Sequence, residues 1–573
     1  MKNKLLKILI FSVFNLGAIA TFGQNISTEW SKQISGSQPE SGNSITIGIS
    51  GNIYQTGSFS DSLFFNIGGN AEMLIAKGIP GSDSYLSKFD QNGNMIWIKH
   101  FAGNFFCHAA SIAIDDDENL YLTGSFADTA WLDQGNVPIK LISTGEIDAF
   151  ICKVNSNGIF EWAKQIGGIY RTEGTSITID KFGSIFYTGM FSGTVDFDPG
   201  IATYNLTSEG VFGFSDIFIA KLDIDGNFEF AKQFKGEFGE VSTAITTDSV
   251  NNIYIAGRFV QTVDFDPDVS IFELQAQNGT DAFIAKLQND GEFIWANRIG
   301  GQGTSSISDI KIDDNNLYLA GIFSGVTDFD PSVNEYLLSS EHPTILDDRN
   351  SIFICKITDN GDFIWVNKLT TGWSGYVSLF IKTHQIYVAG QFNNPVDFDP
   401  SINFMEVTPS GYVDIFVAKY DDDSDLKYVR TFGGAGIEFD GASSIGVDMN
   451  DNVFITGSFE GNLNFDNFGL SAYISSDVFI TKFRNIPTYT DEFIISDVFV
   501  SPNPTRGQIL INTNTSIVQN IKVFNSLGQR VQNTNTTNTT GEYIIDLSGY
   551  SNGTYFLQIS TEFGIESCKI LKF

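Results

Sequence analysis

Apolar and polar residues alternate along many short segments of the chain, and the same segments recur in the same order. In one copy, residues 176–180 (SITID) alternate, a short turn follows, and residues 185–191 (IFYTGMF) alternate again. A period of two residues is typical of strands with one buried face. This pattern predicts antiparallel strands joined by tight turns.

Two further segments complete each repeating unit. Residues 148–154 (DAFICKV) form an apolar run, and residues 159–168 (IFEWAKQIGG) follow it after the dipeptide Asn157-Gly158. Asn-Gly and Asp-Gly favour two-residue hairpin turns because both residues must adopt a positive φ. Each unit is therefore predicted to form four antiparallel strands, which is the composition of one β-propeller blade.

The second strand of the unit carries a string of the form aromatic-x-[TA]-G-x-F that marks the repeat. Its glycine recurs at Gly57, Gly124, Gly189, Gly257, Gly321, Gly390 and Gly457. The spacing stays between 64 residues (257 to 321) and 69 residues (321 to 390). Such a regular period is the signature of a repeat architecture, in this chain with seven copies.

The phase of the repeat distinguishes a ring from an open solenoid. Residues 29–36 (EWSKQISG) match the fourth strand of a unit, whereas the seventh unit ends with residues 477–483 (DVFITKF), which match the third. Pairing of these segments would complete the last blade and leave no sheet edge unpaired. An open solenoid would instead need polar caps. We therefore predict an all-β fold in which residues 25–484 form a seven-bladed β-propeller closed by the N-terminal strand.

The repeat stops near Phe483, and residues 485–497 are predicted to be a linker. Residues 498–573 contain short alternating segments such as ILINTN, EYIIDLS and TYFLQIS, separated by turns and by a polar tract, NTNTTNTTG. About seven short strands in so few residues predict a small, separate β-sandwich.

The first residues have the organisation of an export signal. Three lysines precede an apolar run at residues 8–20, which predicts a signal peptide over residues 1–23. That run is too short to cross a bilayer comfortably, so no membrane span is expected. The chain has 67 acidic and 33 basic side chains and a formal charge of −34. This charge repels nucleic acid, so nucleic-acid binding is not expected.

An insertion of about twenty residues follows the marked strand, and in four repeats it reads VDFDP or TDFDP. The paired aspartates are Asp196 and Asp198, Asp264 and Asp266, Asp328 and Asp330, and Asp397 and Asp399. In a strand the two carboxylates share one face, so they could bind Ca²⁺ if backbone carbonyls supplied further oxygens. The alternative, which we favour, is that the phenylalanine packs between blades and the aspartates cap the next turn. A Ca²⁺ site needs six or more ligands, and the motif supplies two.

Catalytic residues are not apparent. The four histidines, His100, His108, His342 and His384, occupy different repeat positions, and no HExxH, GxSxG or phosphate-binding motif occurs. We therefore predict that the chain is not an enzyme. The alternative is a hydrolase or lyase acting on extracellular polysaccharide, which would need two carboxylates across a cleft.

Two resemblances extend this interpretation. Residues 281–301 (DAFIAKLQNDGEFIWANRIGG) and 251–259 (NNIYIAGRF) resemble the bacterial β-propeller repeat called SBBP, and the likeness extends roughly over residues 29–484. It implies a seven-bladed β-propeller.

The C-terminal segment resembles the type A C-terminal sorting domain of the type IX secretion system. The matching residues include Pro502, Asn503, Pro504, Gly507, Gly528, Gly553 and Tyr555. The resemblance implies passage through the periplasm, recognition by the type IX machinery, and release from or attachment to the outer cell surface. Together with the propeller, it predicts a secreted or surface-displayed scaffold that binds an extracellular protein or glycan.

Overall fold

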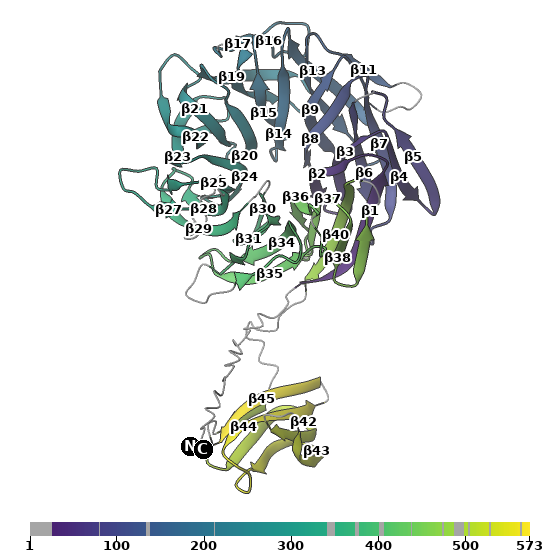
Figure 1. The fold of residues 1–573 in the computed structure, drawn as a ribbon, viewed down its shortest axis with the longest axis vertical. Helices are drawn as coiled ribbons and strands as arrows, with labels where there is room; N and C mark the ends of the chain where they lie inside the picture. Colours follow the sequence, from purple (N-terminus) through teal and green to yellow (C-terminus); the bar gives the residue numbers. More distant parts are fainter. Residues whose placement is uncertain are drawn as a thin grey trace, which may run out of the picture. The chain divides into compact units, whose positions relative to one another are not determined.

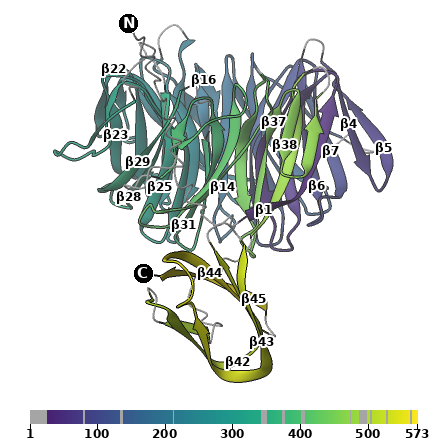
Figure 2. The ribbon, with the colours of Figure 1, turned by 60° about the horizontal axis from the view of Figure 1, so that its bottom comes forward.

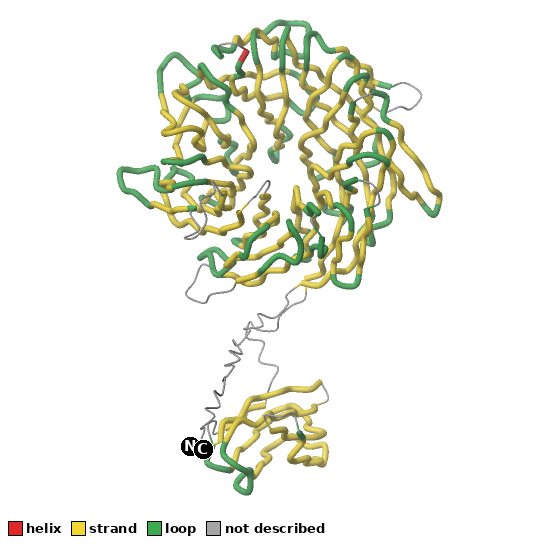
Figure 3. The backbone as a smooth tube through the Cα atoms, viewed as in Figure 1, coloured by secondary structure: helices red, strands yellow, loops and turns green. Residues whose placement is uncertain are grey.

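A computed structural model describes most of the chain as two compact units, Met1–Ile486 and Pro487–Phe573. The described residues are 26–78, 81–132, 138–210, 213–340, 350–372, 377–399, 406–436, 438–472, 475–485, 498–501, 505–525, 529–561 and 564–572. Strands make up nearly all of the regular structure in these ranges (Figure 3). None of these residues forms a helix long and apolar enough to cross a membrane. The predicted signal peptide and most of the predicted linker lie outside the described residues.

The first unit consists of groups of four antiparallel strands, and within each group every strand pairs with the one that follows it. The groups are β2 (Glu40–Ile47), β3 (Ile53–Ser60), β6 (Ser82–Phe89) and β7 (Met95–Gly103); β8 (Phe106–Ile114), β9 (Leu120–Ala127), β12 (Asp148–Val154) and β13 (Phe160–Gly168); β14 (Thr172–Ile179), β15 (Ile185–Phe191), β18 (Asp216–Leu222) and β19 (Phe228–Gly236); β20 (Val241–Thr247), β21 (Ile253–Asp264), β22 (Glu273–Leu287) and β23 (Phe293–Gly301); β24 (Ser305–Asp313), β25 (Asn316–Phe323), β28 (Asn350–Thr358) and β29 (Phe363–Gly372); β30 (Val377–Lys382), β31 (Gln385–Phe392), β34 (Asp414–Tyr420) and β35 (Leu426–Phe432); and β36 (Gly441–Val447), β37 (Val453–Phe459), β40 (Asp477–Asn485) and β1 (Ile26–Gly36).

The first strand of each group faces a common centre (Figure 1). These innermost strands contact one another in chain order, β2 with β8, β8 with β14, and so on to β30 with β36. The last of them, β36, contacts β2. Each group thus packs against the groups before and after it, and the last repeat lies against the first.

The last group contains strands from both ends of the unit. β1 pairs antiparallel with β40, with Trp30 opposite Lys482 and Ile34 opposite Val478. Figure 1 labels both strands, and Figure 2 shows β1 beside strands of the last repeat. The Trp30 ring is buried, and its indole N–H donates a hydrogen bond to the carbonyl oxygen of Gln91 at 3.1 Å. The sequence phase predicted this pairing, and it joins segments about 450 residues apart.

The insertion after the marked strand forms an outer hairpin in each repeat. The hairpin strands are β4 (Ser62–Ile67) and β5 (Asn70–Ile75); β10 (Thr129–Leu132) and β11 (Ile139–Ile142); β16 (Thr194–Asp196) and β17 (Asn205–Thr207); the outer ends of β21 and β22; β26 (Val326–Asp328) and β27 (Leu337–Ser339); β32 (Val396–Asp397) and β33 (Glu406–Val407); and β38 (Asn462–Phe465) and β39 (Phe468–Ser471).

Each outer hairpin contacts the fourth strand of the preceding group. β16, for example, pairs with β13, with Asp196 opposite Gly167 and Val195 opposite Gly168. The same pairing joins β4 to β1, β10 to β7, β21 to β19 and β26 to β23. The end of the fourth strand, which is a Gly-Gly pair in β13 and β23, is therefore where these insertions are added to the sheet of the preceding group.

The phenylalanine of the Asp-Phe-Asp-Pro motif is fully buried beneath this hairpin. Phe329 packs against Phe353 with ring centroids 4.9 Å apart, and Phe265 packs against Phe283 at the same distance. Burial of one such side chain contributes about 1.5–3 kcal/mol, and an aromatic pair adds roughly 0.5–1.5 kcal/mol. Phe265 also packs against Phe234 of β19, in the preceding group, at 5.1 Å, so this insertion contacts both groups.

The second unit has five strands where the sequence predicts about seven short ones. They are β41 (Val498–Ser501), β42 (Gln508–Asn525), β43 (Arg530–Asp546), β44 (Gly553–Thr561) and β45 (Gly564–Lys572). β42 pairs with β43 along its length and with β44 along its second half. The sequence predicts that the polar tract NTNTTNTTG separates two strands. This prediction is wrong, because the tract lies within β43, where its backbone pairs with β42.

Candidate functional site

The aspartates of the inserted motif bind backbone amides of their own hairpin. The Asp196 Oδ1 atom accepts hydrogen bonds from the N–H groups of Asp198 at 3.1 Å and Tyr204 at 2.8 Å. The Asp198 Oδ1 atom accepts one from the N–H of Gly200 at 2.7 Å. The first carboxylate therefore closes the hairpin loop, and the second fixes the turn that follows.

The other copies of the motif repeat this geometry. Asp264 accepts from Asp266 (3.1 Å) and Phe272 (2.8 Å), Asp266 from Asp268 (3.0 Å), Asp328 from Asp330 (3.1 Å) and Tyr336 (2.9 Å), Asp330 from Ser332 (2.9 Å), and Asp397 from Asp399 (3.1 Å). Among the described residues, no three His, Cys, Asp or Glu side chains gather in a way that could hold a metal ion. The geometry favours turn capping, and Ca²⁺ binding by these residues stays a prediction.

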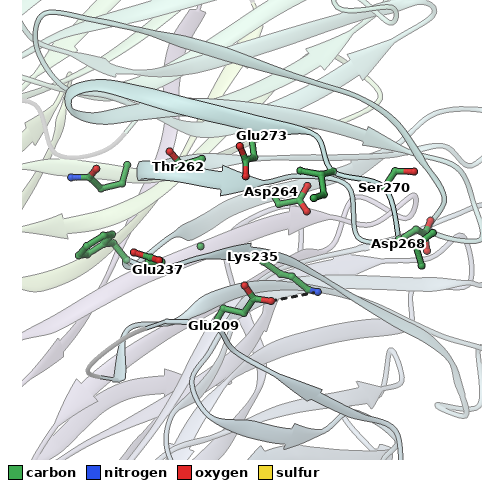
Figure 4. A pocket seen from close by; sticks show the side chains of 13 residues that line it. Glu209, Lys235, Glu237, Thr262, Asp264, Asp268, Ser270 and Glu273 are labelled. Carbon is green, nitrogen blue, oxygen red and sulfur yellow. Dashed lines mark ion pairs between the residues drawn. The ribbon is translucent and has the colours of Figure 1, made fainter.

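A groove of about 880 Å³ lies at the outer rim, between the third group and the inserted hairpin of the fourth repeat. One wall is the end of β19 with the residues after it, including Lys235 and Glu237, and the other is the outer part of β21 and β22, including Asp264 and Glu273 (Figure 4). Because β21 pairs with β19, both walls belong to one continuous sheet. The groove therefore has a stiff frame.

Acidic side chains dominate this rim groove. Its lining includes five carboxylates and one lysine: Glu209, Glu237, Asp264, Asp268, Glu273 and Lys235. The Lys235 ammonium lies 3.6 Å from the Glu209 carboxylate, as the dashed line in Figure 4 marks. The exposed aliphatic side chains of Val269 and Ile271 line the same groove. A surface of this kind complements a ligand that carries positive charges beside apolar groups.

A second cavity of about 350 Å³ lies at the centre of the unit, where every innermost strand contributes to its wall. Its lining is mostly hydroxyl and aliphatic side chains, such as Ser44, Ser111 and Ser176. The charged lining residues are Asp309 and Lys311, and they form an ion pair at 2.5 Å. This neutral lining offers hydrogen bonds but little electrostatic attraction.

The described histidines lie in separate environments. His100 Nε2 lies 2.6 Å from the buried Asp83 carboxylate, and His108 Nε2 lies 3.1 Å from the Asn43 amide nitrogen. His384 is partly exposed, with Nδ1 3.4 Å from Asp313. His342 lies outside the described residues. The structure therefore does not bring His100, His108 and His384 together.

Three of the predicted sorting residues are described. The Gly507 carbonyl accepts a hydrogen bond from the N–H of Leu547 at 2.7 Å, and Gly553 begins β44. The Tyr555 side chain is buried, and its hydroxyl donates to the carbonyl of Ser551 at 2.7 Å. Pro502, Asn503, Pro504 and Gly528 lie outside the described residues.

Two family models match parts of the chain. Residues 161–190 match the beta-propeller repeat, and residues 499–572 match the secretion system C-terminal sorting domain. These matches confirm both resemblances seen in the sequence. The chain thus combines a β-propeller fold with a sorting domain, which supports its secretion and implies interaction with the secretion machinery.

Curated relatives are similar over part of the chain. An uncharacterized WD repeat-containing protein, L264, of Acanthamoeba polyphaga mimivirus is 24% identical over 285 residues, covering 42% of this chain and 20% of the viral protein. The regulatory protein FlaEY of Caulobacter vibrioides is 22% identical over 183 residues, covering 31% of this chain and 18% of that protein. The matched part spans about a fifth of the length of these relatives.

Two solved structures illustrate the structural matches. The β-propeller domain of the Trilobed protease from Pyrococcus furiosus has a TM-score of 0.34 at 9% identity, covering 81% of this chain and 99% of that domain. A mutant of Synechocystis apocarotenoid oxygenase has a TM-score of 0.35 at 10% identity, covering 79% of this chain and 97% of that protein. These scores are too low to support a conclusion about this chain.

Proposed function

We propose that the first unit is a single seven-bladed propeller closed by β1, and that it is an exported scaffold that binds a basic segment of an extracellular protein in the rim groove. The pairing of β1 with β40 and the contact of β36 with β2 support closure. The observation that carries the binding function is the rim groove, in which five carboxylates and one lysine surround about 880 Å³.

Segments near the start and the end of the sequence support export. The sorting domain at residues 499–572 supports secretion. The lysines and apolar run at the start of the chain support entry into the periplasm as the first step. The propeller then reaches the medium or the cell surface, where its acidic rim meets extracellular partners.

The groove suits recognition because the ends of β19, β21 and β22 frame the short loops that complete its walls. Strands of one sheet hold side chains in fixed positions, so little ordering is lost on binding. Asp268 and Glu209 already pair with Lys232 at 2.6 Å and Lys235 at 3.6 Å. Glu237 and Glu273 are therefore the carboxylates that attract a lysine or arginine of the ligand, while Val269 and Ile271 offer contact to apolar residues of the same segment. Exposed charge pairs contribute roughly 0.2–1 kcal/mol each, so several must act together.

Binding of a lysine-rich peptide by the full chain tests this proposal. We expect Glu237→Gln with Glu273→Gln to weaken binding about threefold to tenfold, since each lost pair removes up to about 1 kcal/mol. Binding of the unaltered chain should also weaken as salt rises. Calorimetric titration measures both effects.

The matched control is Glu335→Gln, which removes an exposed carboxylate from the inserted hairpin of the next repeat, outside the groove. It should leave the affinity unchanged. Equal losses in all variants would assign binding to net charge rather than to the groove. Binding of an amino-sugar oligomer in preference to the peptide would overturn the proposed partner class.

A further inference from the structure

A buried aspartate occupies the same position of the third strand in most repeats, where that strand meets the next group. These residues are Asp83, Asp148, Asp216, Asp281, Asp414 and Asp477, each at most 3% exposed. The residue that begins the next group lies beside them: the N–H of Glu240 donates to the carbonyl of Ser215, and the N–H of Glu40 donates to that of Ser476. We call each such junction a seam.

Two seams pair their aspartate with a base from the neighbouring fourth strand. Asp83 lies 2.6 Å from His100 Nε2, and Asp281 lies 2.6 Å from Arg298 Nη1. The residue contributed by the next group in these seams is neutral, Cys107 or Ser305 respectively. Each of these buried carboxylates thus has one nitrogen base within hydrogen-bonding distance.

Three seams have the opposite arrangement. Their fourth-strand residue is neutral, and the next group contributes a second acid. The acid pairs are Glu40 with Asp477, Glu240 with Asp216, and Asp440 with Asp414. In each pair the backbone N–H of the first acid donates to the carbonyl oxygen of the residue just before the second, at 3.0, 3.3 and 3.3 Å respectively. The neutral fourth-strand residues are Gln33, Gln233 and Thr431. These three seams therefore hold two carboxyl groups and a neutral fourth-strand residue, whereas the other two seams hold one carboxyl group and one base. The remaining described seam, at Asp148, has Gln165 beside it and a single carboxyl.

A further acid faces two of these pairs. Glu209 faces Asp216, and Glu438 faces Asp440. Glu40 faces the buried hydroxyl of Tyr85. Two ionised carboxylates cannot be buried side by side without a proton or a cation between them, because each raises the cost of ionising the other.

The immediate surroundings favour a proton over a metal ion. N–H donors point at the acids, including Gln33 Nε2 at 2.5 Å from Asp477 and the N–H of Glu209 at 3.1 Å from Asp216. The fit is close, since a Cβ on Gly236 would lie 2.1 Å from Glu240 Oε1. A divalent cation such as Ca²⁺ would need six or more oxygen ligands.

We propose that each of these three acid pairs binds one proton in the folded protein, so that the seams between groups weaken as the pH rises. One carboxyl of each pair then donates a hydrogen bond to the other, as His100 and Arg298 do in their own seams. The pair of Glu40 and Asp477 places one such proton where the first repeat meets the last.

The electrostatics give the direction of this dependence. Burial, followed by the adjacent carboxyl, raises the pKa of Glu40 from 4.5 to about 8 and that of Glu240 from 4.5 to about 9. Burial likewise raises the pKa of Asp440 from 3.8 to about 7. A carboxyl whose pKa is higher in the folded state stabilises the fold fully below its unfolded pKa. That contribution is lost as the pH rises through the folded pKa.

The experiment measures the unfolding equilibrium of the full chain by urea titration between pH 5 and pH 9.5. Each extra proton held by the folded state makes the unfolding constant rise about tenfold per pH unit. Glu240→Gln should reduce the pH dependence of the unfolding constant by the equivalent of one proton, and Glu40→Gln should do the same. The exposed control Glu335→Gln should leave the slope unchanged.

A double variant, Gln233→Arg with Glu240→Ser, reproduces the seam at Asp281 and should also flatten the slope while keeping the fold. Infrared spectroscopy adds a direct readout, since protonated carboxyl bands should persist at neutral pH and weaken in Glu240→Gln. Equal slopes in all variants, or the absence of those bands, would overturn the proposal. So would a loss of stability on chelation that Ca²⁺ restores and Glu240→Gln abolishes.

Discussion

At the scale of single residues, this protein uses carboxyl groups in three ways. Asp196 and its equivalents cap turns by accepting backbone N–H groups. Glu237 and Glu273 point into the rim groove, where they remain available to a ligand. Glu240 and its equivalents are buried against a second acid. The role of each carboxyl group depends on how deeply it is buried and on which hydrogen-bond donor lies nearest to it, rather than on whether the residue is Asp or Glu.

The turn-capping role leads to a prediction at Asp328. Replacement by Ala removes the acceptor of two backbone hydrogen bonds and should destabilise the fold by about 1–2 kcal/mol. Asp328→Asn keeps an oxygen acceptor and should cost less than about 1 kcal/mol. Urea unfolding measures both.

The same role leads to a prediction about metal removal. Chelator should leave the melting temperature of the unaltered protein unchanged, whereas a chelator-induced fall would support the Ca²⁺ hypothesis instead.

At the scale of elements, the inserted hairpins connect neighbouring groups. In the described part of the chain, five of the seven hairpins extend the sheet of the preceding repeat at the end of its fourth strand, as β16 does on β13. Its buried phenylalanine packs against the third strand of its own repeat, as Phe329 does on Phe353. One insertion therefore ties two groups together by backbone pairing and by apolar contact.

Phe329 tests this connecting role. Phe329→Ala should destabilise the first unit by about 3–5 kcal/mol, because it leaves a cavity among side chains that cannot collapse fully. Val333→Ala, at the exposed tip of the same hairpin, should change stability by less than about 0.5 kcal/mol. Denaturant titration of both variants makes the comparison. A Phe329 effect as small as the control would mean that the hairpin adds little to the core.

At the scale of the whole molecule, the proposed closed ring depends on β1. Ser31 and Thr481 lie opposite each other in the β1 and β40 pairing, with their hydroxyl oxygens 2.8 Å apart. The chain between them is about 450 residues long. Holding such distant segments together costs chain entropy, which the buried side chains Trp30 and Ile34 help to offset.

A disulfide at this position would lock the ring. Ser31→Cys with Thr481→Cys should form an intramolecular bond under mild oxidation and stabilise the unit by about 2–4 kcal/mol. Ser31→Cys with Thr456→Cys is the mismatched control, because Thr456 lies opposite Ile480 rather than β1. Gel mobility and mass spectrometry identify the bond. Cross-links between separate chains in the matched variant would contradict closure within one chain.

The sequence by itself determined the strands of the first unit, the repeat period and the sorting domain. Local alternation and turn dipeptides predict the strands, and the order of the motifs predicts the repeat and the sorting domain. Even the pairing partner of residues 29–36 could be inferred from the phase of the repeat. Strand lengths in the second unit could not, since the polar tract gave no sign that it would pair with β42.

Only the tertiary structure decided which carboxylates meet. Glu40, Glu240 and Asp440 occupy the same repeat position. The sequence does not show that each of them is buried beside an aspartate of the preceding repeat, and this contact is seen only in the structure. The rim groove likewise joins β19 to the hairpin of the following repeat. Both features depend on contacts between repeats, and the cost of burying charge is set by those contacts rather than by neighbours along the chain.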